Sequence, residues 1–414
     1  MKTLPESRAF ILVLDGFGIG SAPDAADFGD QGADTLGHIA EACFRGRADR
    51  PGVRTGPLRL PFLESLGLGE AAKLAAGQLP AGFSPACPGG IYAACREISH
   101  GKDTSSGHWE LAGVPVLFEW GYFPGEPSFP ENLVELLVRT AGLPGILGNC
   151  HASGTEIIKQ LGEEHIRTGK PICYTSADSV FQVAAHEDYF ELERLYALCR
   201  LARNILDQER LNIARVIARP FTGSNGDFIR TPNRRDYSVP PPEPTLLDAL
   251  QAKGRNVCAI GKIKDIFANR GISEAVKAPD NNGIFHAVLD ASTQAAPGSL
   301  VFANFVDFDM LYGHRRDING YAFALETLDS QLAGLVRELR PDDLVIITAD
   351  HGCDPAGPGF NHTREFVPAL LFGPNVSAGS AGIRGTFSDI GQTVASHLEI
   401  PPLKKGTAID LEGR

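Results

Sequence analysis

Short apolar runs alternate with helix-periodic segments through much of the 414-residue chain. The apolar runs are rich in β-branched and aromatic residues and are too short for helices, so they predict strands buried on both faces. These runs lie at Ala9–Leu14, Asn256–Ile260, Leu300–Val306 and Leu344–Ile347. Apolar residues at helical spacing predict helices at Ala33–Cys43, Tyr189–Leu211 and Leu246–Leu250. Strands that alternate with helices predict a doubly wound α/β sheet.

The pattern changes near residue 120, where the proline-rich segment PGEPSFPEN begins at position 124. A second proline-rich segment, VPPPEPT, lies at 239–245, and a further strand is predicted between the two at Arg215–Phe221. A chain of this length exceeds one ordinary core, and proline-rich segments are typical of linkers. The sequence therefore predicts a smaller α+β cap domain, 120–236, inserted between core segments 1–119 and 237–414.

Three of the predicted strands are followed by acidic residues, and histidines lie close by in the sequence. Carboxyl ends of parallel strands meet at the edge of the sheet where α/β proteins bind ligands. Carboxylate oxygens and imidazole nitrogens are ligands for Zn²⁺ and Mn²⁺. A single acidic residue with a histidine nearby could be explained as a helix cap and a loop histidine. Three such strand ends together predict a site for two metal ions. The candidates are Asp15, Asp307 or Asp309 (spacing does not choose between them), His314, Asp350, His351 and His362.

Two glycine-containing segments invite a nucleotide-binding interpretation that their spacing does not support. After Gly16 and Gly18, the dinucleotide fingerprint requires glycine at position 21, which is serine. Gly101–Glu110 is no P-loop, because Asp103 follows Lys102 where serine or threonine is required. This second segment carries the hydroxyl groups of Thr104, Ser105 and Ser106. They indicate either a helix N-cap or a nucleophile activated by metal ions, and spacing leaves both open.

Charge narrows the range of partners. The net charge of −12 and the pI near 5.4 argue against nucleic acid or an anionic membrane as the main partner. Within this acidic chain, about fifty residues carry six positive charges, which indicates either an anion site or a solvated basic face. These charges are Arg215, Arg219, Arg230, Arg234, Arg235 and Lys262.

Nothing in the sequence predicts export or membrane insertion. No apolar run approaches the roughly 18–20 residues of a membrane helix, and the first ten residues lack the apolar core of a signal peptide. The eight cysteines are scattered without a C-x-x-C pair, as is typical of free thiols in a reducing compartment. We therefore expect a cytoplasmic protein.

Several long motifs carry a resemblance to a known family: LDGFGIG, GKDTSSGHWELAG, GKIKDIFAN, NFVDFDMLYGHRRD, TADHGCDP and HTRE. They resemble the alkaline phosphatase superfamily, and within it most closely the phosphopentomutases, over nearly the whole chain. The resemblance implies one metal site at Asp15, Asp350 and His351 and a second at Asp309, His314 and His362, which favours Asp309 over Asp307. It also implies that Thr104 carries phosphate and that the sugar phosphate is faced by Asp178, Arg215, Ile217, Arg230 and Lys262.

The same resemblance implies an activity. Two Mn²⁺ ions and a phosphothreonine would interconvert ribose (or deoxyribose) 1-phosphate and 5-phosphate through ribose 1,5-bisphosphate. A sugar bisphosphate, glucose 1,6-bisphosphate or ribose 1,5-bisphosphate, would prime the enzyme. Two departures are visible: Gly16 stands where many relatives have serine, and Ser105 and Ser106 are rival hydroxyls beside Thr104. The alternatives are a two-metal phosphatase or phosphodiesterase, a phosphoglycerate-type mutase, and an inactive metal-binding relative.

Overall fold

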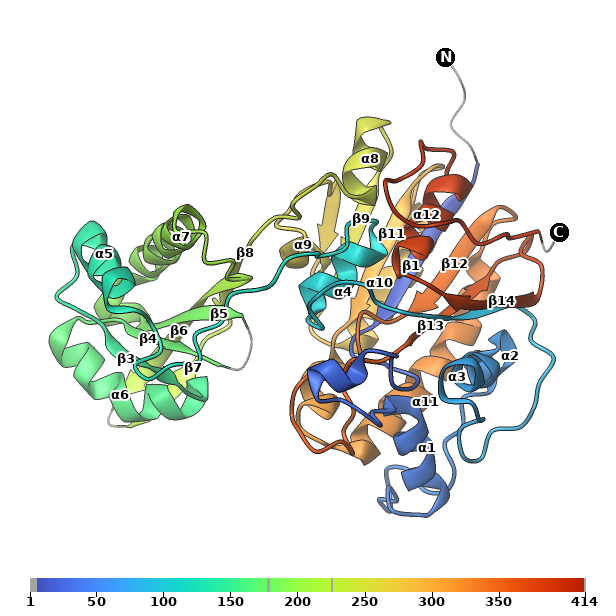
Figure 1. Ribbon diagram of the computed structural model, residues 1–414, viewed down its shortest axis with the longest axis horizontal. Coiled ribbons are helices and arrows are strands. Elements are labelled where there is room, and N and C mark those ends of the chain that lie inside the picture. Colours follow the sequence, from blue (N-terminus) through green and yellow to red (C-terminus); the bar gives the residue numbers. More distant parts are fainter. Residues whose placement is uncertain (1–5, 177–178, 225, 413–414) are drawn as a thin grey trace. The chain divides into compact units, whose positions relative to one another are not determined.

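The computed structural model describes residues 6–176, 179–224 and 226–412. The chain forms two compact units, each described here by itself (Figure 1). The core unit comprises Met1–Leu117 and Pro241–Arg414, and the cap unit comprises Phe118–Pro240. The cap unit thus occupies the stretch for which the sequence predicts an inserted domain, with boundaries slightly outside 120 and 236.

The described residues of the core unit build an eight-stranded sheet. Five neighbouring strands are parallel, and β13 runs antiparallel to both strands beside it. β1, β11 and β12 are buried along their whole length, as their apolar runs predict. The strand order is β10 (Glu274–Val276), β9 (Val257–Ile260), β11 (Leu300–Phe305), β1 (Arg8–Leu14), β12 (Asp343–Thr348), β13 (Val367–Phe372), β2 (Ile91–Cys95) and β14 (Gly379–Arg384).

Helices cover both faces of this sheet, so the prediction of a doubly wound α/β core is confirmed (Figure 1). One group comprises α4 (Thr104–Leu111), α8 (Leu246–Ala252), α9 (Ile263–Ile266) and α12 (Ser388–His397). The other comprises α1 (Thr35–Phe44), α2 (Pro61–Leu66), α3 (Leu68–Ala76), α10 (Asn281–Gln294) and α11 (Ile318–Leu335). Short 3₁₀ segments, η1 (Ala25–Phe28) and η4 (Val336–Glu338), complete the unit.

The cap unit has its own mixed sheet and two small cores. Its strands are β3 (Leu147–His151), β4 (Ile172–Thr175), β5 (Val180–His186), β6 (Arg215–Ser224) and β7 (Asp227–Arg230), with β8 (Arg235–Ser238) pairing with β6. α5 (Glu131–Ala141) and α7 (Leu192–Gln208), which follows the π-helical turn η2 (Glu187–Glu191), contribute to one hydrophobic core. α6 (Gly154–Thr168) contributes Ile157 and Ile158 to the other. This is the smaller α+β domain that the sequence predicts.

One local prediction is wrong. The sequence places Asp307 and Asp309 at the end of a strand, where a period of two residues would put both on one face, but β11 ends at Phe305. Asp309 lies in the π-helical turn η3 (Phe308–Gly313) that follows. A helical turn separates the directions of residues two apart, so strand alternation does not apply to these two aspartates.

No helix among the described residues meets the length and apolarity required to cross a membrane.

The core sheet buries an ion pair at the amino ends of β1 and β12. The Arg8 Nε lies 2.8 Å from the Asp343 Oδ1, and both side chains are fully buried. The Arg8 Nη1 also donates to the Ser292 carbonyl oxygen at 2.6 Å, which ties β1 and β12 to α10.

Breaking this ion pair on one side should be costly. Replacing Arg8 with Met leaves Asp343 buried without its cation, which typically costs about 3–5 kcal/mol. We expect the Arg8→Met, Asp343→Leu double variant to recover most of that loss. Arg45→Met, which removes the exposed partner of Glu41, should change stability by less than about 1 kcal/mol. Urea unfolding of the four proteins measures these differences, and a single Arg8 variant as stable as the parent would contradict the expectation.

Candidate metal centre

The carboxyl ends of β11, β1 and β12 lie side by side because these strands are neighbours in the sheet. Asp15 follows β1, Asp350 and His351 follow β12, and Asp309 lies in η3 just beyond β11. The structure therefore brings Asp15 close to Asp309 and Asp350, which follow it in the chain by 294 and 335 positions. All six predicted ligand residues belong to the core unit.

These residues form one continuous cluster. Donor atoms of Asp15, Asp350 and His351 lie within 4.8 Å of one another, and so do those of Asp309, His351 and His362. His351 belongs to both groups, and its ring stacks on that of His362 with centroids 3.8 Å apart. The sequence assigns His351 to one site only, whereas the geometry makes it the junction between the two groups.

His314 joins this cluster through Asp309. Its Nε2 lies 3.3 Å from the Asp309 Oδ1, and the His362 Nε2 lies 3.5 Å from the same oxygen. The rings of His314 and His362 are 4.9 Å apart, centroid to centroid. The second predicted ligand set is thus brought together around one carboxylate oxygen.

Three carboxylate oxygens in the cluster test whether it suits a cation. Among the described residues, Asp15 Oδ1, Asp309 Oδ1 and Asp350 Oδ2 are buried and have no hydrogen-bond partner. Each faces an imidazole nitrogen: the His351 Nε2 lies 3.5 Å from Asp15 Oδ1 and 3.2 Å from Asp350 Oδ2. Because buried acceptors are normally satisfied, this set of oxygen and nitrogen donors fits divalent metal ions.

The backbone orients the three imidazoles. The Nδ1 of His351 lies 3.0 Å from the Gly352 carbonyl oxygen, and the Nδ1 of His362 lies 3.1 Å from that of Lys102. The His314 Nδ1 likewise contacts the Phe360 carbonyl oxygen. A carbonyl only accepts, so each Nδ1 carries a proton, and this hydrogen bond directs each Nε2 towards the carboxylates, as in metal-binding histidines.

Proton affinities in the cluster are shifted strongly. Burial and the neighbouring Asp350 carboxylate raise the pKa of Asp15 to about 6. Burial acts in the same direction on Asp309, but the surrounding imidazoles, His362 first, outweigh it and lower the pKa of that carboxyl. Burial opposes protonation of His351, yet the Asp350 and Asp15 carboxylates raise its pKa to about 10. An arriving metal ion would therefore displace a proton from His351.

Thr104 is the first residue of α4, and its hydroxyl faces the cluster. The Thr104 Oγ1 lies 3.3 Å from the His351 Nε2. The helix can approach this closely because residue 107 is glycine: a Cβ there would lie 2.0 Å from the Asp350 carbonyl oxygen. The N-cap of α4 is thus Asp103 and not one of the three hydroxyl residues, and the Thr104 hydroxyl reaches the cluster.

The neighbouring serines are placed differently. The Asp103 carboxylate accepts hydrogen bonds from the backbone N–H groups of Ser105 and Ser106. It also accepts from the Ser106 hydroxyl at 2.6 Å. Asp103, the N-cap residue of α4, therefore binds the Ser106 hydroxyl, whereas the Thr104 hydroxyl contacts His351.

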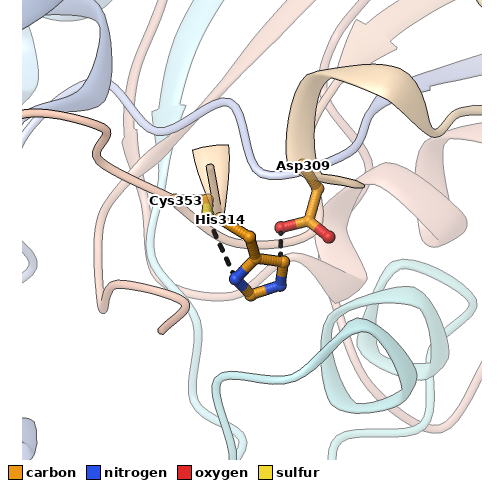
Figure 2. A group of neighbouring side chains, drawn as sticks. All are labelled: Asp309, His314 and Cys353. Atoms are coloured by element: carbon orange, nitrogen blue, oxygen red, sulfur yellow. Dashed lines mark hydrogen bonds and ion pairs between the residues drawn. The ribbon is translucent and has the colours of Figure 1, made fainter. Parts of the chain in front are cut away.

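A cysteine that the sequence interpretation did not include also lies here. Cys353 is buried beside Asp309 and His314 (Figure 2), and its Sγ lies 4.0 Å from the His314 Nδ1. Burial, with Asp309 nearby, raises the pKa of this thiol well above its ordinary value. The sequence signal was its position two residues after His351. Asp307, by contrast, accepts from the Asn281 N–H at 2.8 Å and belongs to the start of α10.

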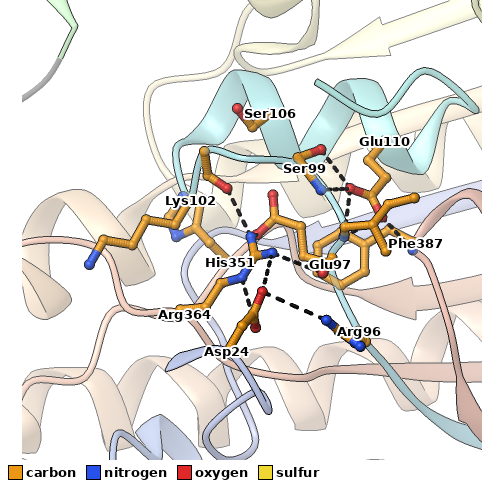
Figure 3. Close-up of polar contacts among 12 residues, drawn as sticks. Asp24, Arg96, Glu97, Ser99, Lys102, Ser106, Glu110, His351, Arg364 and Phe387 are labelled. Atoms are coloured by element: carbon orange, nitrogen blue, oxygen red, sulfur yellow. Dashed lines mark hydrogen bonds and ion pairs between the residues drawn. The ribbon is translucent and has the colours of Figure 1, made fainter. Parts of the chain in front are cut away.

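Arg364 contacts the loop before Thr104, and Figure 3 shows it between Asp24 and Glu97. Its Nη1 donates to the Gly101 carbonyl oxygen at 2.9 Å and to the Glu97 carboxylate at 2.7 Å. Its Nη2 donates to the Asp24 carboxylate at 2.9 Å. Because the guanidinium is planar and buried between these partners, it fixes the direction from which the chain enters α4.

The residues predicted to face a sugar phosphate are divided between the units. Lys262, in the core, has its Nζ 3.7 Å from the Asp15 Oδ2 and remains partly exposed. Arg215 and Ile217 lie on β6 of the cap, and Arg230 ends β7. Asp178 lies outside the described residues.

The cap residues form a basic cluster of their own. Arg215 and Arg234 reach the Asp236 carboxylate at 3.8 and 2.7 Å. Arg219 is half-buried on β6, and burial together with Arg234 and Arg230 lowers the pKa of its guanidinium to about 10. Cations that crowd one another in this way favour an anionic ligand.

Comparisons with known proteins identify the family of the chain. A family model described as the metalloenzyme superfamily matches residues 7–402. The phosphopentomutase of Sinorhizobium medicae is 61% identical over 97% of this chain and 100% of its own length. That of Rhizobium meliloti is 62% identical over 95% of this chain and 97% of its own length. Among solved structures, a phosphoglycerate mutase of Leishmania mexicana aligns over 99% of this chain and 98% of its own, at 14% identity and a TM-score of 0.48.

Relatives above 60% identity over nearly the full length leave little room for a different family, and the buried Asp and His cluster suits the metal dependence that the family model describes. The chain belongs to the phosphopentomutases, a family of the metalloenzyme superfamily, and is an isomerase of the intramolecular phosphotransferase class.

Proposed function

We propose that the chain interconverts ribose 1-phosphate and ribose 5-phosphate, and their deoxyribose counterparts, through a phosphorylated Thr104. The observation that supports this most is the contact between the Thr104 hydroxyl and His351 inside the cluster. The Thr104 phosphate passes to the free hydroxyl of the sugar phosphate and forms ribose 1,5-bisphosphate. The other phosphate of that intermediate then returns to Thr104, so product leaves and the phosphoenzyme is restored. A sugar bisphosphate, glucose 1,6-bisphosphate or ribose 1,5-bisphosphate, supplies the first phosphate.

The site would hold two Mn²⁺ ions. Asp15, Asp350 and His351 would hold one, and Asp309, His314 and His362 would hold the other. When bound, the ions would neutralise charge on the transferring phosphoryl group and lower the pKa of the attacking hydroxyl. The unsatisfied buried oxygens of the three aspartates support this assignment.

The protein's own residues place the reacting groups. Asp103 caps α4 and so orients Thr104 at its first turn. Lys262 adds a positive charge beside Asp15, on the side open to solvent, where a dianionic phosphate needs one. The second transfer uses the other phosphate of the same bisphosphate. The enzyme must therefore retain this intermediate between the two transfers, since its loss to water would end the cycle.

The cap would supply that retention. Arg215 and Arg230 would bind the phosphate remote from Thr104, with Ile217 and Asp178 against the sugar. The basic cluster of β6 and the residues after β7 supports this role. Pentose phosphates would be the only partners we propose, in the cytoplasm, where the eight unpaired cysteines would stay reduced.

Membership of the family favours the mutase over a phosphatase, phosphodiesterase or phosphoglycerate mutase on the same core. One coupled assay separates them. The enzyme with Mn²⁺ and a bisphosphate primer should convert ribose 1-phosphate to ribose 5-phosphate faster than it releases inorganic phosphate, and 3-phosphoglycerate should be inert. Phosphate release that keeps pace with substrate loss would contradict the proposal.

Thr104 should be the phosphate carrier. Thr104→Ala should abolish mutase activity because it removes the hydroxyl in contact with His351, while Thr104→Ser should retain part of it because the hydroxyl survives. Ser105→Ala is the matched control and should keep both activity and label. Incubation with labelled bisphosphate followed by peptide mapping decides the point, and label on Ser105 or Ser106 would refute the assignment.

Removing metal should abolish turnover, and Mn²⁺ should restore it. Asp309→Asn should lower kcat at least a hundredfold, because it removes the carboxylate shared by His314 and His362. Asp307→Asn should change kcat by less than about fivefold, because this side chain accepts from the Asn281 N–H at the start of α10 and lies outside the cluster. Elemental analysis should find two ions per wild-type chain. Fewer than two at saturation, or equal losses in the two variants, would count against the centre.

Arg215 should bind substrate without taking part in the chemistry. Arg215→Ala should raise KM about 10- to 100-fold with little change in kcat, as the loss of a charged hydrogen bond worth about 1.5–3 kcal/mol requires. Arg167→Ala, at an exposed arginine of α6 in the same unit, is the control and should leave KM unchanged. Steady-state kinetics with ribose 1-phosphate measure both, and an unchanged KM for Arg215→Ala removes it from the site.

A further inference from the structure

Two fully buried polar side chains beside the metal centre have no part in the proposed chemistry. His108 lies on α4 and Asn304 on β11, and neither is exposed. The Asn304 Nδ2 lies 3.1 Å from the Asp15 Oδ2 and 3.3 Å from the His108 Nε2. A polar pair in the centre of a sheet is costly unless its hydrogen bonds are made, so these contacts determine what the pair does.

The contacts define how both side chains are oriented. The amide nitrogen of Asn304 has two hydrogens, one for the Asp15 carboxylate and one for the His108 ring. The reverse orientation of the amide would place its oxygen against that carboxylate. Because Asn304 donates to the Nε2 of His108, this nitrogen accepts, and the ring proton of neutral His108 lies on Nδ1.

That proton points to the other side of the site. The His108 Nδ1 lies 2.8 Å from the Thr104 carbonyl oxygen, with the geometry of a hydrogen bond, and 3.1 Å from the Asp350 Oδ2. Both atoms are acceptors. The hydrogen bond goes to Thr104, and the same N–H group lies in electrostatic contact with the Asp350 carboxylate. A single ring therefore lies between one turn of α4 and Asp350, and through Asn304 it connects to Asp15.

We propose that His108 is a positioning residue that sets Thr104 against the ligands of the first metal site. It acts as a neutral Nδ1–H donor whose tautomer Asn304 fixes. The inference rests on the proposed function of Thr104 and of the metal centre. His108 and Asn304 together contact three parts of the site. These are the helix that carries Thr104, the Asp350 carboxylate and the Asp15 carboxylate. A helix held in this way keeps the Thr104 hydroxyl in place as its phosphate is gained and lost.

The competing role for His108 is packing alone. Its ring stacks on Phe302 with centroids 5.9 Å apart, so a filled core position would also explain its burial. Three substitutions separate the two roles. In His108→Asn the amide nitrogen takes the place of Nδ1, so the donor to Thr104 and Asp350 survives. In His108→Gln the amide reaches the place of Nε2, so only the contact with Asn304 survives. His108→Phe keeps the ring and loses both nitrogens.

The two roles predict opposite orders. For a positioning donor, His108→Asn should stay within about tenfold of wild type in kcat and in Mn²⁺ affinity measured by calorimetry. His108→Gln and His108→Phe should each lose about 10- to 100-fold in both, with KM for ribose 1-phosphate unchanged. For a packing residue, His108→Phe should be the best of the three. The midpoint of thermal unfolding of the metal-free proteins reports packing independently, and there the Phe variant should be at least as stable as the Asn variant.

The inference is overturned if His108→Phe binds Mn²⁺ and turns over like wild type, or if His108→Asn is as impaired as His108→Phe. Its failure is distinct from failure of the proposed function. If wild-type protein takes no phosphate on Thr104, the proposed function fails, and the order of Mn²⁺ affinities still decides whether His108 positions the ligands. If Thr104 is phosphorylated normally and the order of affinities is reversed, only the inference about His108 fails.

Discussion

Three carboxylates held together away from water are the constraint on which the core unit depends. Asp15, Asp309 and Asp350 are all buried, and two like charges about 4 Å apart repel by roughly 4 kcal/mol even at an effective dielectric constant of 20. Such a group persists only when rigid elements hold it and positive charge faces it. The strand order supplies the first condition, since β11, β1 and β12 are neighbours. The imidazoles and Lys262 supply part of the second, and divalent ions would supply the rest.

The four-residue stretch that begins at His362 shows how the loops around this group are kept in place. Its last member, Glu365, is buried and accepts from the backbone N–H groups of Thr35 at 2.9 Å and Gly20 at 3.3 Å. Glycine is required on both sides of this carboxylate, because a Cβ at Gly18 or at Gly352 would lie 2.1 or 2.3 Å from its oxygens. Glu365 therefore ties the loop after β1 to the loop after β12, while Arg364 beside it holds the approach to Thr104. One short stretch thus supplies a candidate ligand and also the anchors that position the other ligands.

The sequence allowed much of this to be predicted, for a physical reason. Strands buried on both faces must be apolar throughout, so runs such as Ala9–Leu14 are recognisable, and a charged residue directly after them marks the edge of the sheet. The role of Asp309 was not accessible to spacing, because it depends on a π-helical turn that an apolar pattern does not encode. Family resemblance chose Asp309 over Asp307, and the geometry agrees, since only Asp309 lies in the cluster. His108 and Cys353 were missed because their positions depend on how separate elements pack, which no local pattern records.

The strand order also has a consequence for how the chain is made. β1 leaves the ribosome first, yet its two neighbours in the sheet, β11 and β12, begin only at Leu300 and Asp343. The cap, by contrast, is one continuous stretch with its own sheet and cores, so all its partners are present once Pro240 has emerged. Domains fold as units during synthesis, and long-range parallel pairing is slow. The cap can therefore fold before β11 and β12 are synthesised. Until then both edges of the apolar strand β1 are unpaired, and this segment of the nascent chain needs protection from aggregation.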